Sequence, residues 1–358
     1  MPHLVSIRGR APTVNEMDHR ISMLHGAGGE LMGDLLDRLI LPRFSAVTTT
    51  RGGVGLSALD DGATVDVPAG ERVVVTTDSH VVKPIFFPGG DIGRLAAAGT
   101  INDLVMMGAR PIGLTLAAII EEGFPIAHLE RILDSFARVL ETVGAAVVCG
   151  DTKVMPAGDL DGIALNTTGV GATSHVIGDA GLHIGDAVIV TGTIGDHGMA
   201  LLAAREEFHL STPLQSDVAP LWPFLAPVIE RYATQIHGMK DPTRGGLAAA
   251  LNEMARKSAT CIVVDDAAIP MRSEVVALSD VLGISPLTVA NEGKAILVVA
   301  GEVAEDVVRM LTSHKLGTDA RRIGRVTEEY PGRVLLETEV GGRRFLDMPL
   351  GDPVPRIC

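Results

Sequence analysis

Apolar residues recur along the chain with two different spacings, and their alternation predicts the elements of the fold. Strands are predicted where short β-branched or apolar runs occur, at 73–77, 113–120, 145–149 and 163–171. Apolar stripes at 92–109 and 129–143 have the period of a helix, and the second stripe is strongly amphipathic. Strands that alternate with helices in this way predict a sheet covered by helices.

The alternation resumes after a polar, glycine-containing segment at 173–185. Further strands are predicted at 187–190, 262–264 and 295–299, and helices at 198–207, 246–257 and 303–314. Two edge strands are expected near Arg325 and Val334, before a proline-rich tail. We therefore predict an α/β (α+β) fold with two helix-backed sheet domains. Its parts are an N-terminal segment with a glycine-rich loop (1–45), a first domain (46–172), a second domain (173–345) and a mobile tail (346–358).

Composition excludes several classes of protein. Only 3% of the 358 residues are aromatic, so the core must consist of Ala, Val, Leu and Ile. The net charge of -14 argues against a nucleic-acid partner, because phosphate contacts need clustered Lys and Arg. No run of 18 apolar residues predicts a membrane span, and the first residues do not form a secretory leader.

The chain has three cysteines, Cys149, Cys261 and Cys358. An odd set without close spacing argues against a disulfide framework and against a zinc site made of cysteines. We expect a cytoplasmic protein, in which Cys358 stays a free thiol. The prolines before Cys358 make the tail either a frayed end or a semi-extended arm that presents the thiol elsewhere.

Acidic residues stand beside Gly or Thr at several predicted element ends. They occur in the strings Asp60-Asp61-Gly62, Thr77-Asp78-Ser79, Gly150-Asp151-Thr152-Lys153 and Lys240-Asp241-Pro242-Thr243-Arg244. Each string alone also fits a turn or a helix cap. Together, carboxylates that end elements of one sheet would converge on one edge and suit Mg²⁺ with its phosphates.

Two further features support a phosphate site. Asn102-Asp103 is a polar pair inside an apolar helix, so it needs a partner in solvent or in a site. Gly26-Ala27-Gly28-Gly29 offers backbone N–H groups at a helix start, a common cradle for phosphate. No Walker-type loop occurs, so metal would hold the phosphates instead.

These strings together resemble the ATP-dependent superfamily of aminoimidazole ribonucleotide synthetase, selenophosphate synthetase and thiamine-monophosphate kinase. Within it, the chain is most similar to the hydrogenase maturation carbamoyl dehydratases, the HypE family. The strings that carry this similarity are His25-Gly26-Ala27-Gly28-Gly29, Thr77-Asp78-Ser79-His80-Val81-Val82, Gly150-Asp151-Thr152-Lys153-Val154, Asn291-Glu292-Gly293-Lys294 and Pro355-Arg356-Ile357-Cys358. A selenophosphate synthetase would carry Cys or selenocysteine with Lys in the N-terminal glycine loop, where this chain has His25-Gly26.

The resemblance implies a fold, a reaction and partners. It implies a homodimer whose first domains pair through their sheets, with ATP near that interface. A carbamoyltransferase, HypF, would load a carbamoyl group onto Cys358, and ATP would drive its dehydration from thiocarboxamide to thiocyanate. The cyano group would pass to iron on a HypC–HypD scaffold for [NiFe]-hydrogenase. A non-catalytic scaffold whose cysteine tail docks into a partner is the alternative.

Amide dehydration needs a phosphate clamp, a base and a thiol, and this assigns roles to the residues. We expect Asp61, Asp103 and Asp241 to bind Mg²⁺. Nucleotide contacts are expected from Gly26, Gly28, Gly29, Asp78, Asn102, Asp151 and Arg244. Cys358 would carry the substrate, Lys153 would neutralise phosphoryl charge, and Glu292, tuned by Lys294 or Lys153, would act as base. Glu292 and Lys294 also fit a solvated turn, and His197 fits a base, a phosphate contact or a turn residue.

Overall fold

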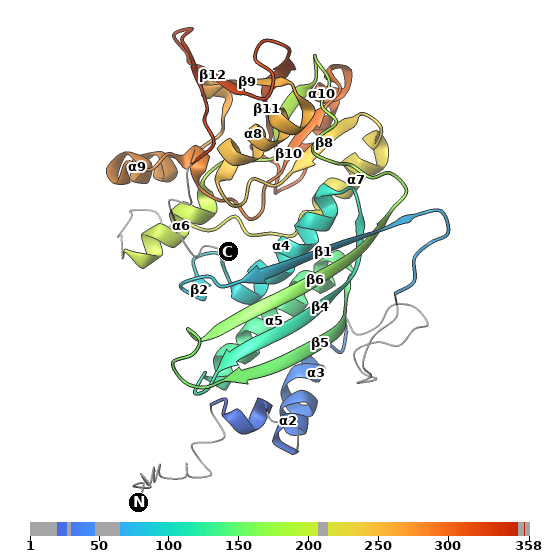
Figure 1. Cartoon of the computed structure of the whole chain (residues 1–358), viewed down its shortest axis with the longest axis vertical. Coiled ribbons are helices and arrows are strands. Elements are labelled where there is room, and N and C mark those ends of the chain that lie inside the picture. The colour runs from blue at the N-terminus through green and yellow to red at the C-terminus, as the bar shows by residue number, and fades with distance from the viewer. Residues whose placement is uncertain (1–19, 27–29, 47–64, 207–213, 350–353, 355–358) are drawn as a thin grey trace, which may run out of the picture.

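The computed structural model describes residues 20–26, 30–46, 65–206, 214–349 and Val354, which form two lobes (Figure 1). The first lobe is built on a four-stranded sheet of order β1-β6-β4-β5. Its strands are β1 (Arg72–His80), β4 (Arg110–Glu121), β5 (Ala146–Met155) and β6 (Ile163–Thr173). β4 and β5 are parallel, and β6 is antiparallel to both β1 and β4.

Two helices cover one face of this sheet, α4 (Ile92–Met106) and α5 (Ile126–Val143). The amphipathic pattern of α5 buries one stripe, which includes Leu129, Ile132 and Phe136. By contrast, α4 is apolar on all sides because it lies between the sheet and the second lobe. No described element covers the opposite face of the sheet, and there Val73 and Val75 of β1 are 54% and 62% exposed. We call it the uncovered face.

Short elements complete the first lobe. They are η1 (Met23–Gly26), α2 (Glu30–Leu35), the π-helical η2 (Leu36–Ile40), α3 (Leu41–Arg43), β2 (Phe86–Phe87) and β3 (Gly90–Asp91). η1 lies beside β5, and β2 pairs with β3 just before α4.

The second lobe has a seven-stranded sheet of order β13-β12-β9-β11-β7-β10-β8. Its strands are β7 (Ala187–Val190), β8 (Ile236–Lys240), β9 (Cys261–Asp265), β10 (Ile296–Val299), β11 (Arg321–Thr327), β12 (Val334–Glu337) and β13 (Arg343–Phe345). All residues of β7 and β10 are buried, which explains their continuous apolar runs. The prediction of edge strands near Arg325 and Val334 was wrong. β13 covers β12, and β11 lies between β9 and β7.

The helices of the second lobe are α6 (Asp196–Arg205), α7 (Trp222–Tyr232), α8 (Gly246–Ser258), α9 (Ser273–Leu282) and α10 (Ala304–Thr312). Short 3₁₀ turns follow at η4 (Asp266–Ala268), η5 (Pro286–Thr288) and η6 (Gly301–Val303). α7 packs against α4 and α5, and one large hydrophobic cluster therefore runs through both lobes. In the described part of the chain, no helix is both long and apolar enough to cross a membrane.

Candidate active site

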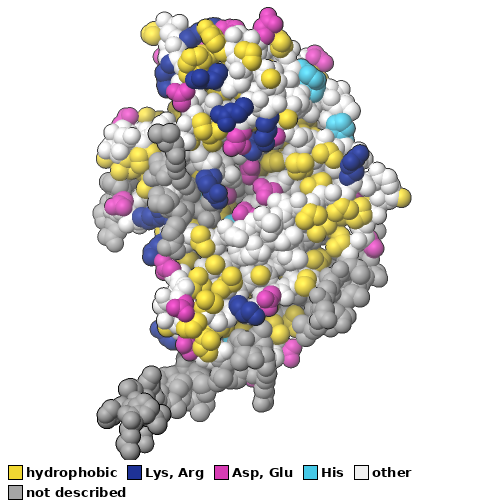
Figure 2. Space-filling view, viewed as in Figure 1, with side chains coloured by type: hydrophobic (Ala, Val, Ile, Leu, Met, Phe, Trp, Pro, Cys, Tyr) yellow, Lys and Arg dark blue, Asp and Glu magenta, His cyan; other side chains and the backbone are white. Residues whose placement is uncertain are grey.

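A cavity of about 280 Å³ lies where the two lobes meet, and we call it the acidic cavity. Its lining includes Asp78 of β1, Asp103 of α4, and Asp241 and Glu292 of the second lobe. In the space-filling view, acidic and basic side chains gather in the band between the lobes (Figure 2). Residues far apart in the sequence therefore converge on one small space.

Close packing of α4 on β1 positions the two carboxylates of the first lobe. Thr76 Oγ1 donates a 2.8 Å hydrogen bond to Asp103 Oδ2, and Asp78 Oδ2 lies 3.4 Å from Nε2 of the buried His80. Gly99 permits this approach, because a Cβ there would lie 3.2 Å from His80 Cε1 and 3.7 Å from Asp78 Oδ2. Burial lowers the pKa of His80, while Asp78 opposes that shift.

Two glycines place Asp241 against the loop that carries Glu292. Gly245 (φ +77°) and Gly246 (φ +62°) lead into α8 in the left-handed conformation, which favours glycine. A Cβ on Gly246 would lie only 2.6 Å from Val289 O. The Asn291 backbone N donates a 3.0 Å hydrogen bond to Pro242 O, which ties the two segments together.

The backbone of Glu292 is fixed, whereas its carboxyl group is not. Its N–H donates to Asp217 Oδ1 at 3.0 Å, and its carbonyl oxygen accepts from Asn102 Nδ2 at 3.1 Å. The side chain is 4% exposed, and within the described residues Oε1 has no hydrogen-bond partner. A buried carboxyl oxygen without a partner is costly, so this atom is available to a ligand.

The carboxyl groups of the cavity raise one another's pKa values. Burial, followed by Asp103, raises the pKa of Asp241 to about 7. Burial, followed by Asp241, Asp217, Asp78 and Asp103, raises the pKa of Glu292 well above its ordinary value. Burial also raises the pKa of Asp103, and Asp78 adds to that shift. A bound cation would relieve this repulsion, and hard carboxylate oxygens are the ligands that Mg²⁺ prefers.

The structure gathers part of the predicted site. Asp78, Asp103, Asp241, Arg244 and Glu292 all line the acidic cavity. Predicted residues that lie outside the described part of the chain are Gly28, Gly29, Asp61 and Cys358. Gly26 ends η1 beside β5 and is not among the residues that line the acidic cavity.

The expected convergence fails for Asp151 and Lys153. β5 continues to Met155, so residues 150–153 lie inside the strand and not at its end. β5 and β1 form opposite edges of the sheet, and the buried Thr152 and Val154 face the helices. Asp151 and Lys153 therefore point from the uncovered face, away from Asp78 of the same chain.

Three other residues have roles that the sequence did not indicate. Asn102 is buried, and its side chain bonds the backbone of Ala219, Leu221 and Glu292, so it positions the Glu292 loop. Lys294 lies 3.4 Å from Asp217 and so does not tune Glu292, whose pKa is set by burial and carboxylates. His197 lies fully buried in the first turn of α6, with Nδ1 2.7 Å from Ser216 Oγ.

Lys240 and Glu253 also line the cavity, and the sequence analysis gave neither of them a role. Lys240 Nζ lies 3.0 Å from Glu253 Oε2 and lowers the pKa of Asp241. Lys240 directly precedes Asp241, and that adjacency was the available signal. Glu253 lies on the polar side of α8. Nothing in the sequence marks it as a cavity residue, because surface helices carry many such carboxylates.

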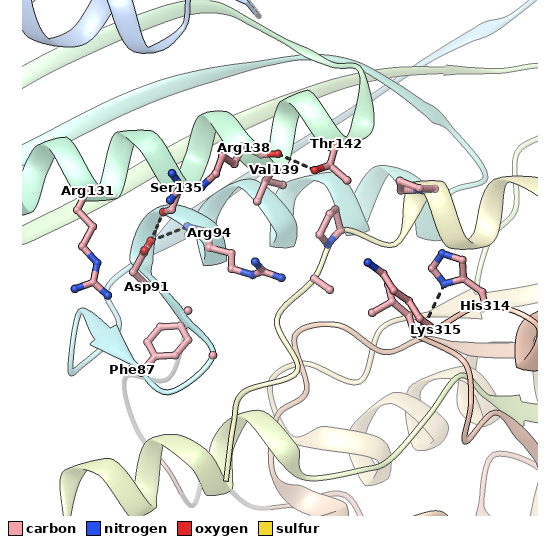
Figure 3. A pocket seen from close by; sticks show the side chains of 16 residues that line it. Phe87, Asp91, Arg94, Arg131, Ser135, Arg138, Val139, Thr142, His314 and Lys315 are labelled. Carbon is pink, nitrogen blue, oxygen red and sulfur yellow. Dashed lines mark hydrogen bonds between the residues drawn. The ribbon is translucent and has the colours of Figure 1, made fainter. Parts of the chain in front are cut away.

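A second cavity of about 770 Å³ lies beside α4 and α5 (Figure 3), and we call it the arginine cavity. Arg94 and Lys315 extend into it from opposite walls, with Arg131 at one end. Arg94 Nε donates to Val218 O at 2.9 Å, and the Arg131 guanidinium lies 4.1 Å from the centre of the Phe86 ring. Arg94 and Arg131 therefore already have partners in the protein.

Comparison with known proteins places this geometry in a family. Residues 59–173 match the N-terminal domain of AIR synthase related protein, and residues 183–337 match its C-terminal domain. Carbamoyl dehydratase HypE of Cupriavidus necator is 42% identical over 347 residues, or 96% of this chain and 97% of that protein.

Two solved structures are similar over most of the chain. A crystal structure of hydrogenase maturation protein HypE in complex with ATP has a TM-score of 0.88 at 37% identity, covering 94% of this chain and 99% of that one. A chain from a HypE–HypF complex has a TM-score of 0.76 at 41% identity, covering 82% of this chain and 94% of that one.

Proposed function

This chain belongs to the HypE carbamoyl dehydratase family, and on that premise we propose that it uses ATP to dehydrate a carbamoyl group on its own Cys358. The product would be a thiocyanate that supplies cyanide ligands to the iron of [NiFe]-hydrogenase. The observation that carries the proposal is the acidic cavity, where three aspartates and an unpaired Glu292 face one space. The relative crystallised with ATP, which spans nearly the whole chain, supports ATP as the phosphoryl donor.

The lining of the acidic cavity suits a magnesium ion with its phosphates. Asp78, Asp103 and Asp241 would hold Mg²⁺, whose chemistry when bound is to neutralise charge on the phosphate oxygens. Arg244 lines the same cavity and has the planar donors that bind phosphate in pairs. These residues would orient the γ-phosphate toward the incoming amide.

The reaction divides into two steps with balanced bonds. The thiocarboxamide oxygen attacks the γ-phosphorus, the bond to ADP breaks, and the nitrogen releases its first proton to water. Glu292 then takes a proton from the nitrogen while the C–O bond breaks, and its electron pair leaves with phosphate. Loss of both nitrogen protons leaves a C≡N group on the Cys358 sulfur.

Glu292 suits the role of base because its backbone is fixed by Asp217 and Asn102, while Oε1 of its carboxyl group has no hydrogen-bond partner among the described residues. Burial and neighbouring carboxylates raise its pKa, which favours the protonated form in the empty cavity. A cation held by the three aspartates offsets that shift, so the base would become active only when the cavity is loaded.

The described part of the tail packs against α8 and the residue that precedes it, next to the cavity lining. Leu346 O accepts a 2.8 Å hydrogen bond from Asn252 Nδ2 of α8, and a Cβ on Gly245 would lie 3.4 Å from Pro349 Cγ. Gly245 directly follows Arg244 of the cavity lining. Val354 is completely buried, and Cys358 follows four residues later. An extended segment of that length spans at most about 14 Å.

We further propose a homodimer in which the uncovered sheet face of one protomer packs on that of its partner. Val73 and Val75 make part of this face apolar, and a two-fold axis would let one patch cover itself. Asp151 and Lys153 lie on this face, so they would serve the acidic cavity of the partner. Such a dimer would account for a role of both residues despite their distance from Asp78 in their own chain.

The proposed partners follow from the same family. HypF is the proposed carbamoyl donor, which the solved HypE–HypF complex of a relative supports. A HypC–HypD scaffold is the proposed cyanide acceptor. The proposed compartment is the cytoplasm, where Cys358 stays reduced.

Mass spectrometry of the C-terminal peptide tests the proposed reaction. After incubation with the carbamoyl donor system and ATP, the peptide should carry a cyano group. With ATP replaced by a non-hydrolysable analogue after loading, it should carry only the carbamoyl group. A peptide that stays carbamoylated in the presence of ATP and Mg²⁺ would favour the non-catalytic scaffold.

A further inference from the structure

A cluster of two histidines and an aspartate lies in the second lobe, outside both cavities. It consists of His183, Asp186 and His237, and we call it the His–Asp–His cluster. We propose that it is a binding site for a divalent transition-metal ion of the zinc class. The proposal is independent of the carbamoyl chemistry, because none of the three residues lines the acidic cavity.

The three side chains are already spaced as ligands around one ion. Nδ1 of His183 lies 3.2 Å from Nδ1 of His237, which lies 2.9 Å from Asp186 Oδ2 and 3.0 Å from Oδ1. In a tetrahedral site with bonds of about 2.0–2.1 Å, neighbouring ligand atoms are about 3.3 Å apart. All three ligand atoms lie within 4.8 Å of one another, so His183 and Asp186 would have to approach each other by at most about 1.5 Å to bind one ion.

A β-bulge aims His237 at this point. In the pairing of β10 with β8, Val298 lies opposite Gly238 and Val299 lies opposite Ile236, so His237 has no opposite residue. Bulges bend a strand locally and re-aim a side chain. Asp186 directly precedes β7, the other neighbour of β10, so the bulge turns His237 across the end of β10 toward Asp186.

A backbone hydrogen bond fixes the carboxylate of Asp186. Asp186 is 3% exposed, and the His183 backbone N donates a 2.7 Å hydrogen bond to its Oδ2. This bond also fixes the backbone of His183, the second nitrogen ligand. Among the ion pairs of the described residues, Asp186 appears only with His237, so no lysine or arginine neutralises it there.

A single proton serves this cluster incompletely. One hydrogen on His237 Nδ1 would be shared between the carboxylate and the lone pair of His183 Nδ1, so neither acceptor has a full hydrogen bond. A cation would use both nitrogen lone pairs and the carboxylate at once. Imidazole and carboxylate together suit Zn²⁺, Ni²⁺ or Co²⁺, and the exposed His183 leaves a further position open to water.

Cobalt titration tests the site, because Co²⁺ bound by nitrogen ligands absorbs visible light. The full-length protein is freed of metal with a chelator and titrated with CoCl₂ in excess Mg²⁺, which occupies the oxygen-lined acidic cavity. We expect a single equivalent of Co²⁺ with a tetrahedral spectrum, which Zn²⁺ displaces. No such band in the wild-type protein would overturn the proposal.

Matched variants locate the ion. His237→Gln and Asp186→Asn should weaken Co²⁺ binding at least about tenfold, the lower limit for disturbing a metal site. His175→Gln changes an exposed histidine outside the cluster and should leave affinity and spectrum unchanged. Circular dichroism and dehydratase activity report whether each variant folds. A folded His237→Gln protein that binds Co²⁺ like the wild type would also overturn the proposal.

Discussion

The two cavities beside α4 carry opposite charge, and a single helix separates them. Every residue of α4 is buried except Arg94 and Asp103, which line the arginine cavity and the acidic cavity respectively. Nine residues at roughly 100° per residue place these side chains on opposite sides of the helix. The helix thus keeps a cluster of anions and a cluster of cations apart.

The two cavities differ in whether their charged side chains have interaction partners within the protein. In the arginine cavity, Arg94 has the Val218 carbonyl and Arg131 has the Phe86 ring. In the acidic cavity, Asp103, Asp241 and Glu292 all have raised pKa values, and Glu292 Oε1 has no partner in the described structure. Burial and Arg138 also lower the pKa of Arg94, but Asp91 opposes that shift. The acidic cavity therefore has more mutually repelling groups, and it is where we expect a charged ligand to bind.

The largest effect is expected from removing the base of the acidic cavity. Glu292→Gln keeps the size of the side chain but cannot accept a proton, so dehydration should slow by about 10²–10⁴-fold. Carbamoylation of Cys358 should continue, and the C-terminal peptide should accumulate as the carbamoyl form. Glu253→Gln is the matched control, since Glu253 lines the same cavity and contacts Lys240. Equal losses in the two variants would contradict the assignment of Glu292.

The next prediction tests whether Lys153 of a partner chain completes the acidic cavity. Lys153→Ala and Glu292→Gln should each be inactive alone, because each lacks one proposed group. Mixed and allowed to exchange subunits, they should recover about a quarter of wild-type activity, since half of the dimers then hold one intact site. Mixtures that stay inactive although native mass spectrometry shows mixed dimers would place both groups in one chain's site.

A smaller effect concerns stability and pH. The pKa of Asp241 is raised to about 7, so the folded chain holds a proton that the unfolded chain releases above its ordinary pKa of 3.8. The protonated Asp241 carboxyl group therefore contributes its full stabilisation of the folded state below about pH 4, and this contribution is lost as the pH rises to about 7. Without divalent ions, the contribution of this carboxyl group to the free energy of unfolding should fall over that range, on the order of 4 kcal/mol at most.

Asp241→Asn should flatten this pH dependence, and Mg²⁺ should stabilise the wild-type protein more at pH 8 than at pH 5. Chemical denaturation at a series of pH values measures both effects. A wild-type stability that rises steadily from pH 4 to pH 7 would show that the carboxyl groups of the cavity are ionised throughout.

The smallest effect is expected at the arginine cavity. Arg131→Gln removes the contact with Phe86 and should lower stability by about 0.5–1 kcal/mol. The affinity for Mg²⁺ should stay within about twofold of wild type, because the side chain lies on the far side of α4. Isothermal titration calorimetry with MgCl₂ and ATP measures this affinity. A tenfold change in the affinity for Mg²⁺ would show that the two cavities are coupled.

The same comparison shows what sequence can predict. The strand at 187–190 was predicted with its observed bounds, because a fully buried strand keeps an unbroken apolar run. Asp78, Asp103 and Asp241 were predicted as neighbours, since each stands out against apolar or glycine-rich surroundings. Asp151 was misplaced because strand order and the facing of side chains are set by pairing, which the string Gly150-Asp151-Thr152-Lys153 does not encode.

Features that depend on tertiary contacts had no sequence signal. Arg131 and Arg138 occupy the polar side of an amphipathic helix, a pattern typical of a solvated surface. The His–Asp–His cluster depends on a one-residue bulge in β8, and its histidines are 54 residues apart. Asn102 was expected to need a partner, but the sequence could not show that backbone groups of two segments, 219–221 and Glu292, satisfy it.

The burial of Val354 sets how far the Cys358 thiol can reach, because the free length of the tail is counted from the last buried residue. While Val354 stays buried, the four-residue separation limits the Cys358 thiol to within about 14 Å of it, which corresponds to an effective concentration on the order of 0.1 M. If a donor protein loads Cys358 as proposed, a donor site beyond that radius would require Val354 to become exposed, at a cost of about 1.5–3 kcal/mol. Val354 would then be buried most of the time. The frequency with which Val354 becomes exposed would limit the rate at which the donor enzyme reaches Cys358.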